Sequence, residues 1–319
     1  MTTRPPAAFY CVTGGDFFPG AVALLNSLRL VGHREPLFVL DAGMQAGQRE
    51  LLEPHATIVD GPRDAPPSLL KLAARRVHPA GVMALLDADV IVTRPLTEQI
   101  EAASRGGLAA FRNDTDRFFA EWGRLLDLGE LRRGRYLTSS ALFLDAETAD
   151  EILPLVEDRQ RRVDLARTWV GSGSEADPLY FLDQDVINAV VRARLDPGRV
   201  VEYDARLAPI PPFNGVRLAD ETALRCRYDD GAEPHLLHHA SRKPWLVTMR
   251  SNVYSRLLTR LLFGDDVTLR LDSRHLPLRL RRGTAAGAAR LAVDFGVGAP
   301  AYARRKLFPR RIRAWQDSR

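Results

Sequence analysis

The sequence predicts an α/β fold, in which helices flank a mostly parallel sheet and a basic helical extension follows at the C-terminus. Two observations lead to this prediction. Short apolar segments typical of strands alternate with segments of helical periodicity in the first hundred residues, an order typical of parallel sheets. The charge also changes near residue 270: residues 270–319 hold 13 Lys and Arg against 3 Asp and Glu, although all 319 residues together carry only +5.

Each expected element has a local reason. Apolar segments that stop at Gly, Pro or Asp are typical of strands, and apolar residues at helical spacing are typical of helices. The helix from residue 97 is expected to be capped by Thr97 itself. The expected strands cover residues 7–13, 37–41, 56–59, 84–92, 108–111, 136–144 and 200–203. The expected helices cover residues 18–31, 45–52, 68–77, 97–105, 114–128, 146–156 and 183–191.

The apolar segment 84–92 contains Asp87-Ala88-Asp89. Aspartate rarely lies in a buried strand unless it is paired or binds a metal. Strand alternation would direct Asp87 and Asp89 to one side and Ala88 to the other. Two carboxylates placed together suit Mg²⁺ or Mn²⁺. A solvated acidic turn at the end of a strand is the alternative interpretation, and the apolar residues that follow make it less attractive.

Composition excludes several classes of protein. The two cysteines, Cys11 and Cys226, form no CxxC motif and argue against a disulfide framework. No apolar segment has the length of about 20 residues that a membrane span needs. The N-terminus lacks the apolar core of a signal peptide. We therefore expect a cytoplasmic protein. The basic charge belongs to residues 270–319, so nucleic-acid binding by the whole chain is not expected.

Two further stretches carry candidate functional residues. His235, His238 and His239 precede Lys243, and imidazoles are good ligands for Mn²⁺ and related ions. The chain has 42 arginines but only three lysines, so a lysine here indicates a compact point charge suited to phosphate. Asp183 and Gln184 begin a helix, where a carboxylate has either a capping or a catalytic role.

Four of these stretches together resemble nucleotide-sugar glycosyltransferases of the GT-A fold, closest to glycosyltransferase family 8, the glycogenin and lipopolysaccharide galactosyltransferase group. The first is the strand with Asp87-Ala88-Asp89, and the second is Lys71, which lies 16 residues before Asp87, where the family has a basic residue. Asp183-Gln184-Asp185-Val186-Ile187-Asn188 matches the Asp-Gln-x-x-x-Asn start of a family helix, and His238 to Trp245 matches a His–Lys-Pro-Trp segment. The resemblance covers roughly residues 7–250 and implies a Rossmann-like, mostly parallel sheet.

The resemblance implies a role for each residue. Asp87, Asp89 and His238, with His239 as the alternative, would bind Mn²⁺ or Mg²⁺, and Lys243 would face the diphosphate of a UDP-sugar. Lys71 and Ala88 would lie near the donor. Two further groups complete the implied site: Thr13 and Asp16 would border the nucleotide, and Asp183 and Gln184 would face the donor sugar, with configuration at the anomeric carbon retained.

The resemblance also implies a domain division and partners. Residues 1–250 would form the glycosyltransferase domain, with a nucleotide-binding half (1–100) and an acceptor half (101–250), and 251–319 the basic extension. The acceptor would be a glycan, a lipid-linked or a small molecule. The charge of residues 270–319 leaves three interpretations open: contact with anionic lipid at the inner face of the membrane, binding of an acidic partner or nucleic acid, or a solvated helical extension. Thr138-Ser139-Ser140 departs from the family's Asn-Ser-Gly, so a non-catalytic relative stays as an alternative. A sugar nucleotidyltransferase is a second alternative, because it could share the sheet and the acidic pair.

Overall fold

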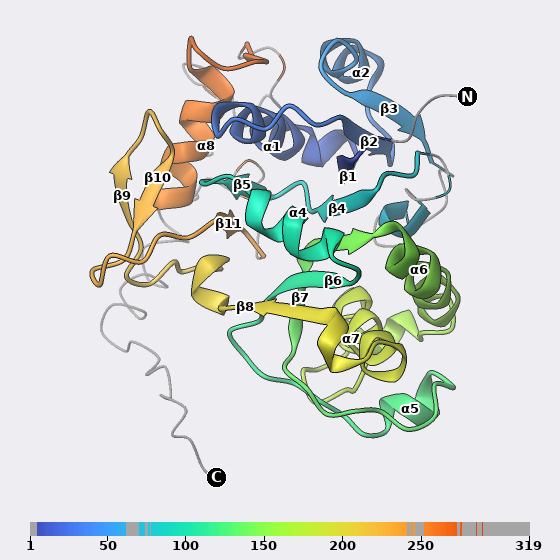
Figure 1. Ribbon diagram of the computed structural model, residues 1–319. Coiled ribbons are helices and arrows are strands. Elements are labelled where there is room, and N and C mark those ends of the chain that lie inside the picture. The colour runs from blue at the N-terminus through green and yellow to red at the C-terminus, as the bar shows by residue number, and fades with distance from the viewer. Residues whose placement is uncertain are drawn as a thin grey trace.

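A computed structural model of the protein describes residues 5–61, 70–73, 76, 78–240, 243, 245, 252–272, 275, 285 and 289. Its centre is a seven-stranded sheet in the order β3-β2-β1-β4-β7-β6-β8. Only β7 runs antiparallel to its two neighbours, β4 and β6, and every other pair is parallel. The expected α/β fold with a mostly parallel sheet is therefore confirmed (Figure 1). Most of the basic extension lies outside the described residues.

The strands of this sheet are β1 (Ala7–Thr13), β2 (Leu37–Asp41), β3 (Thr57–Asp60), β4 (Val82–Leu86), β6 (Leu108–Arg112), β7 (Leu137–Asp145) and β8 (Val200–Tyr203). The α-helices with described ends are α1 (Phe18–Leu30), α2 (Ala46–Leu52), α4 (Thr97–Ser104), α5 (Trp122–Leu125), α6 (Ala146–Gln160), α7 (Asp183–Arg194) and α8 (Val253–Phe263). Residues 70–73 are also helical. Two small antiparallel pairs complete the fold: β5 (Val90–Val92) with β11 (Leu236–His238), and β9 (Arg217–Asp220) with β10 (Arg225–Arg227).

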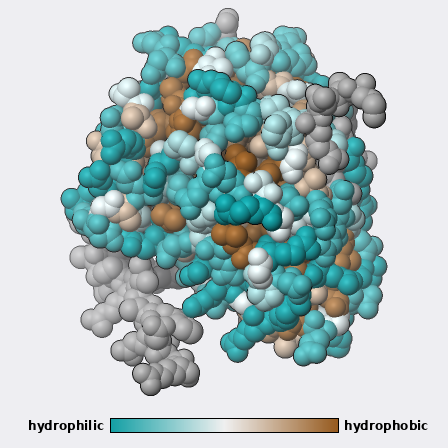
Figure 2. Space-filling view, in the orientation of Figure 1, coloured by the Kyte–Doolittle hydropathy of each residue, from teal (hydrophilic) through white to brown (hydrophobic). Residues whose placement is uncertain are grey.

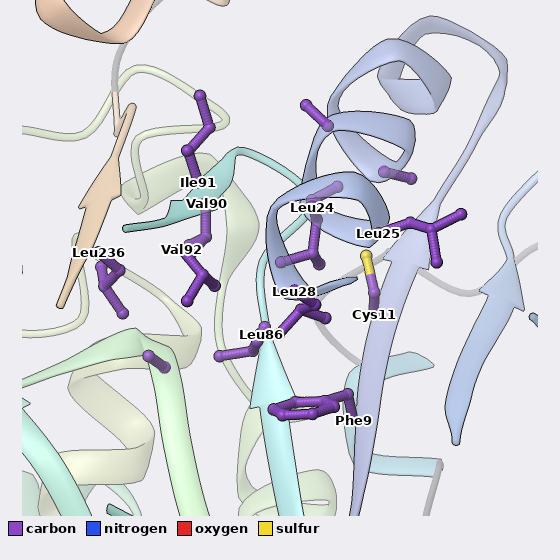
Figure 3. Packing of buried hydrophobic residues seen from close by; sticks show 14 of the residues in the cluster. Phe9, Cys11, Leu24, Leu25, Leu28, Leu86, Val90, Ile91, Val92 and Leu236 are labelled. Carbon is purple, nitrogen blue, oxygen red and sulfur yellow. The ribbon is translucent and has the colours of Figure 1, made fainter. Parts of the chain in front are cut away.

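Apolar side chains pack on both faces of the sheet, because neighbouring residues of β1 alternate between them. Phe9 and Cys11 face one cluster, to which α1, α4, α8, β5 and β11 contribute. Ala8 and Tyr10 face the other, which includes residues of α5, α6 and α7. Figure 3 shows the first cluster, with leucines of α1 lying over Phe9 and Cys11. The outer surface in view is mostly hydrophilic, with small separate apolar areas (Figure 2).

Three local expectations differ from the structure. The segment 84–92 is not one strand, because β4 ends at Leu86 and β5 starts at Val90 in another sheet. Most of 114–128 is not helical: only α5 is, because Arg117 of this segment bonds to Asp185 and to backbone carbonyls of the loop before α7. The helix α4 takes Leu96, not Thr97, as its N-cap, and the Leu96 N–H donates to the His33 Nε2 at 2.8 Å.

The folded body extends beyond the expected boundary at residue 250. The helix α8 packs against α1, and Leu257 and Leu261 on it are fully buried. The Asn26 side chain of α1 donates to the Leu261 and Leu269 carbonyls, both at 2.7 Å. Residues 252–272 therefore belong to the same core as the sheet. No helix among the described residues is long and apolar enough to cross a membrane.

Gly20 of α1 lies where the helix meets the turn between β4 and β5. A Cβ at Gly20 would lie 2.4 Å from the Ala88 carbonyl oxygen and 2.6 Å from the Trp245 ring. We expect Gly20→Ala to lower the free energy of unfolding by about 1–3 kcal/mol through overpacking, although alanine favours helices. Gly47→Ala in α2 is the matched control, because nothing lies within 4 Å of its added Cβ.

Urea unfolding of both variants tests this expectation, because midpoint and slope together report stability. The Gly47→Ala control should gain up to about 1 kcal/mol from helix propensity. A Gly20→Ala variant as stable as the control would show that the helix and the turn can move apart.

Candidate active site

The candidate site is built on the turn Asp87-Ala88-Asp89 between β4 and β5. The Val90 N–H donates to the Asp87 carbonyl at 3.1 Å, and the Asp87 N–H donates to the Ser140 carbonyl of β7 at 2.9 Å. The turn follows the carboxyl end of β4, which lies beside the parallel strand β1. Ligands of open α/β sheets bind at this edge. The two carboxylates are therefore brought together by a turn and not by strand alternation.

A third side chain reaches the two carboxylates from β11. This strand pairs with β5 so that His238 lies opposite Val90. The His238 Nε2 lies 3.5 Å from the Asp89 Oδ1 and 4.0 Å from the Asp87 Oδ2. One ligand atom from each of the three residues lies within 4.8 Å of the others. Two carboxylates and an imidazole are suitable ligands for a divalent cation such as Mn²⁺, so these residues fit a metal site.

His239 occupies a different environment from His238. It is fully buried, and its ring contacts Phe213 and Tyr254 at centroid distances of 6.0 and 4.9 Å. Its backbone N–H donates to the Asp89 carbonyl at 3.1 Å. The imidazole that approaches the carboxylates is therefore that of His238.

Two lysines lie beside the carboxylates. The Lys71 Nζ contacts the Asp87 carboxylate, lies 4.0 Å from the Asp183 Oδ2 and donates to the Ser139 carbonyl at 2.9 Å. The Lys243 Nζ contacts the Asp89 carboxylate, and it also donates to the His239 carbonyl at 2.8 Å. Each carboxylate of the turn thus has one ammonium group against it.

The charges at the site are stabilised by one another in spite of burial. Burial alone would raise the pKa of Asp89, but His238 and Lys243 beside it hold this pKa well below its usual range. Burial alone would lower the pKa of Lys71, but Asp87 and Asp183 raise it above the usual value. At neutral pH the turn therefore presents an ionised carboxylate at Asp89, and Lys71 stays charged.

The start of α7 brings Asp183 and Gln184 to the same side of the sheet. Leu182, the residue before the helix, has a left-handed backbone with φ of +46°. Such backbone is uncommon for a non-glycine residue and often occurs at functional sites. The Gln184 Oε1 accepts a hydrogen bond from the Ser139 N–H at 3.0 Å. This bond and the approach of Asp183 to Lys71 place the first turn of α7 beside the turn between β4 and β5.

Two other residues of α7 have structural roles. The Asn188 side chain bonds to both the N–H and the carbonyl of Leu137 at 2.8 Å, so it joins α7 to the start of β7. Asp185 is fully buried and accepts hydrogen bonds from Arg117 and Tyr136. At the start of this helix, Asp183 therefore lies near the candidate metal ligands, whereas Asp185 stabilises the fold.

Thr13 is the last residue of β1, and Asp16 lies three residues later in a short 3₁₀ helix, Gly15–Phe17. Thr13 is buried, whereas the Asp16 side chain is exposed. The Asp16 carbonyl accepts a hydrogen bond from the Trp245 Nε1 at 2.7 Å. This bond ties the loop after β1 to the segment that carries Lys243. Both residues border the edge at which the carboxylates lie, and their contact with a nucleotide stays a prediction.

Asp183 supports a prediction about stability. Burial, helped by the charge of Asp87, raises the pKa of Asp183, although Lys71 opposes this effect. A carboxyl whose pKa is higher in the folded than in the unfolded protein stabilises the fold at low pH and loses that stabilisation as pH rises through the folded pKa. We therefore expect Asp183→Asn to raise the melting temperature at pH 8, and the gain to disappear below about pH 4.

Thermal unfolding at several pH values checks this prediction. Asp229→Asn serves as the control, because this carboxylate is exposed on the loop after β10. Its replacement should not produce the same pH-dependent gain. A lower melting temperature for Asp183→Asn at pH 8 would contradict the prediction and would show that the ion pair with Lys71 outweighs the cost of burial.

Several contributing residues carry no local sequence signal. Gly20 and Tyr254 are ordinary helix positions in the sequence, yet Gly20 lies against Ala88 and the Tyr254 hydroxyl bonds to the Asp89 carbonyl. The expected departure at Thr138-Ser139-Ser140 lies in β7, where the Thr138 and Ser140 hydroxyls bond to each other at 3.0 Å. The roles of Gly20 and Tyr254 come from contacts with the turn between β4 and β5, far away in the sequence, which a single sequence does not display.

Comparisons with solved structures show what fold this is. The galactosyltransferase LgtC, solved in complex with donor and acceptor sugar analogues, matches with a TM-score of 0.53 at 14% identity, over 81% of this chain and 98% of that chain. The bifunctional glycosyltransferase WbbM matches with a TM-score of 0.55 at 13% identity, over 82% of this chain and 50% of that chain. The glycosyltransferase GlyE of Streptococcus pneumoniae TIGR4 matches with a TM-score of 0.50 at 13% identity, over 82% and 61%.

At these identities the matches show the fold alone, and this fold is the GT-A fold expected from the resemblance. No protein-family model matches the sequence, and no curated protein matches it. An argument about function therefore depends on the residues of the site.

Proposed function

We propose that this protein is a metal-dependent glycosyltransferase that moves a sugar from a nucleotide-diphosphate donor, a UDP-sugar, to an acceptor. The observation that carries this proposal is the cluster of Asp87, Asp89 and His238 at the carboxyl edge of a GT-A sheet. Lys243 and Lys71, two of the three lysines of the chain, lie against this cluster. Such a site suits a substrate that carries a diphosphate.

Cleavage of a sugar–diphosphate bond leaves negative charge on the departing diphosphate. A bound divalent cation would supply Lewis-acid stabilisation of this leaving group. Asp87, Asp89 and His238 would hold the cation, with their ligand atoms already close together. Lys243 would add a fixed positive charge where negative charge develops. The loop with Thr13 and Asp16, tied to the same segment through Trp245, would border the nucleotide.

The sugar would lie on the side of Asp183 and Gln184. Asp183 is held near Lys71, and the Gln184 carbonyl oxygen is engaged by the Ser139 N–H. In this orientation the Gln184 amide nitrogen is the group that can donate to a sugar hydroxyl. Asp183 would stabilise positive charge that develops at the anomeric carbon. This assignment accords with the retention of configuration that the family resemblance implies.

The deciding experiment measures nucleotide release by the purified protein from a panel of UDP-, GDP- and TDP-sugars, with Mn²⁺ and with EDTA. Release from a UDP-sugar that requires Mn²⁺ would support the proposal and would name the sugar. Metal-dependent release from a GDP- or TDP-sugar alone would correct the donor. Formation of a nucleotide-sugar from a nucleoside triphosphate and a sugar phosphate would instead identify a nucleotidyltransferase.

The acceptor belongs to one of three classes, a glycan, a lipid-linked sugar or a small molecule. Donor binding without release would lead to a second panel with these acceptors, and no transfer to any of them would favour a non-catalytic relative. The proposed membrane contact concerns residues 270–319, most of which lie outside the described residues. Pelleting with anionic vesicles, with and without that segment, tests this contact separately.

A further inference from the structure

The backbone of the proposed metal turn is held by a residue of the C-terminal helix. The Asp89 carbonyl accepts two hydrogen bonds: one from the His239 N–H at 3.1 Å and one from the Tyr254 hydroxyl at 2.9 Å. All three residues are buried. The Asp89 carbonyl can only accept, so the Tyr254 hydroxyl is the donor of this bond.

The Tyr254 side chain is itself fixed in place. Its ring lies parallel to that of Phe213, with an interplanar angle of 7° and a centroid distance of 5.9 Å, and it meets the His239 ring edge-on. The helix that carries it begins with a capping box between Asn252 and Ser255, and Asn26 of α1 bonds to its far end. The hydroxyl therefore reaches Asp89 from a rigid element.

We propose that Tyr254 is a positioning residue of the metal centre, through which α8 directs the Asp89 carboxylate toward His238. This inference rests on the proposed metal-dependent function. A carboxylate on a short turn points where its backbone allows, and Asp89 has no regular strand on its N-terminal side to orient it. Groups that orient metal ligands in other proteins affect metal affinity by about 10- to 100-fold when they are changed. The helix expected to lie outside the catalytic domain would thus be part of it.

The structure suggests a conservative test variant. Tyr254→Phe removes the hydroxyl and keeps the ring between Phe213 and His239. The Asp89 carbonyl keeps its bond from the His239 N–H, so no buried acceptor is left without a partner. The expected loss of stability is that of one buried hydrogen bond. A structural role alone would therefore change the melting temperature but not the affinity for a metal at temperatures far below it.

Tyr10→Phe is the matched control. The Tyr10 hydroxyl also donates to a backbone carbonyl, that of His78, and the residue is buried on the other face of the sheet. Mn²⁺ is titrated into wild type and both variants, with and without UDP, and free Mn²⁺ is followed by electron paramagnetic resonance. We expect the dissociation constant to rise about 10-fold for Tyr254→Phe and to stay at the wild-type value for Tyr10→Phe.

Equal affinities for wild type and Tyr254→Phe would overturn the positioning role and leave the metal site in place. A wild-type protein that binds no Mn²⁺ in either condition would overturn both the metal site and this inference. If Tyr254→Phe fails to fold, hydrogen exchange in the wild type decides the question. Because coupling between sites is reciprocal, Mn²⁺ should slow the exchange of amides in α8. Unchanged exchange there would contradict the proposal.

Discussion

Asp89→Asn should abolish metal-dependent release of nucleotide from the donor sugar and should leave the sheet folded. Both His238 and Lys243 approach the Asp89 carboxylate. The His238 Nε2 lies 3.5 Å from it, and the Lys243 Nζ is in direct contact with it. Asparagine keeps the shape of the side chain but lacks the negative charge that a divalent cation requires. We expect the rate with Mn²⁺ to fall by about 10²–10³-fold or more.

Two measurements are needed for Asp89→Asn. Mn²⁺ affinity should fall together with the rate, and far-ultraviolet circular dichroism should show that the protein is folded. Asp229→Asn, which changes an exposed carboxylate on the loop after β10, should match the wild type in both. If the Asp89→Asn variant bound Mn²⁺ and released nucleotide as the wild type does, the metal would have to be held elsewhere.

Most of the sheet was predictable because its strands are short apolar segments that end at Gly, Pro or Asp. The strands β1 and β2 and the helix between them agree with the expected ranges to within a residue. Periodicity was informative there because each element buries one or both of its faces in the apolar clusters on the two sides of the sheet. The same reasoning failed for 114–128, where Arg117 reaches across to Asp185 and the loop before α7. Long-range bonds of this kind override local propensity.

The sequence predicted which residues form the site better than it predicted how they are arranged. The sequence places Asp87 and Asp89 one residue apart, but a turn between two sheets, not strand alternation, sets their relative directions. The choice between His238 and His239 depends on the pairing of β11 with β5, which directs the His238 ring to the carboxylates. The contributions of Gly20 and Tyr254 depend on the packing of two helices from opposite ends of the chain, for which a single sequence carries no local pattern.

Lys243→Ala should separate catalysis from metal binding. The Lys243 Nζ contacts the Asp89 carboxylate and donates to the His239 carbonyl, so its charge lies where a diphosphate held by this turn would be. Removal of one preorganised electrostatic group costs about 2–4 kcal/mol of transition-state stabilisation, so we expect a fall in kcat of about 10²–10³-fold. The affinity for Mn²⁺ should be unchanged or tighter, because a positive charge beside Asp89 competes with the cation.

This pair of effects distinguishes Lys243→Ala from Asp89→Asn, which should lose rate and metal affinity together. Lys243→Arg is the graded control: it keeps the charge, but its planar guanidinium is larger than the ammonium group. We expect its kcat to lie between those of wild type and Lys243→Ala, measured as UDP release at saturating Mn²⁺ and donor. A Lys243→Ala enzyme with wild-type kcat would mean that this lysine only balances the charge of Asp89. A Lys243→Ala enzyme that lost Mn²⁺ as well as rate would place the lysine among the residues that hold the metal turn in shape, in the same role that we assign to Tyr254.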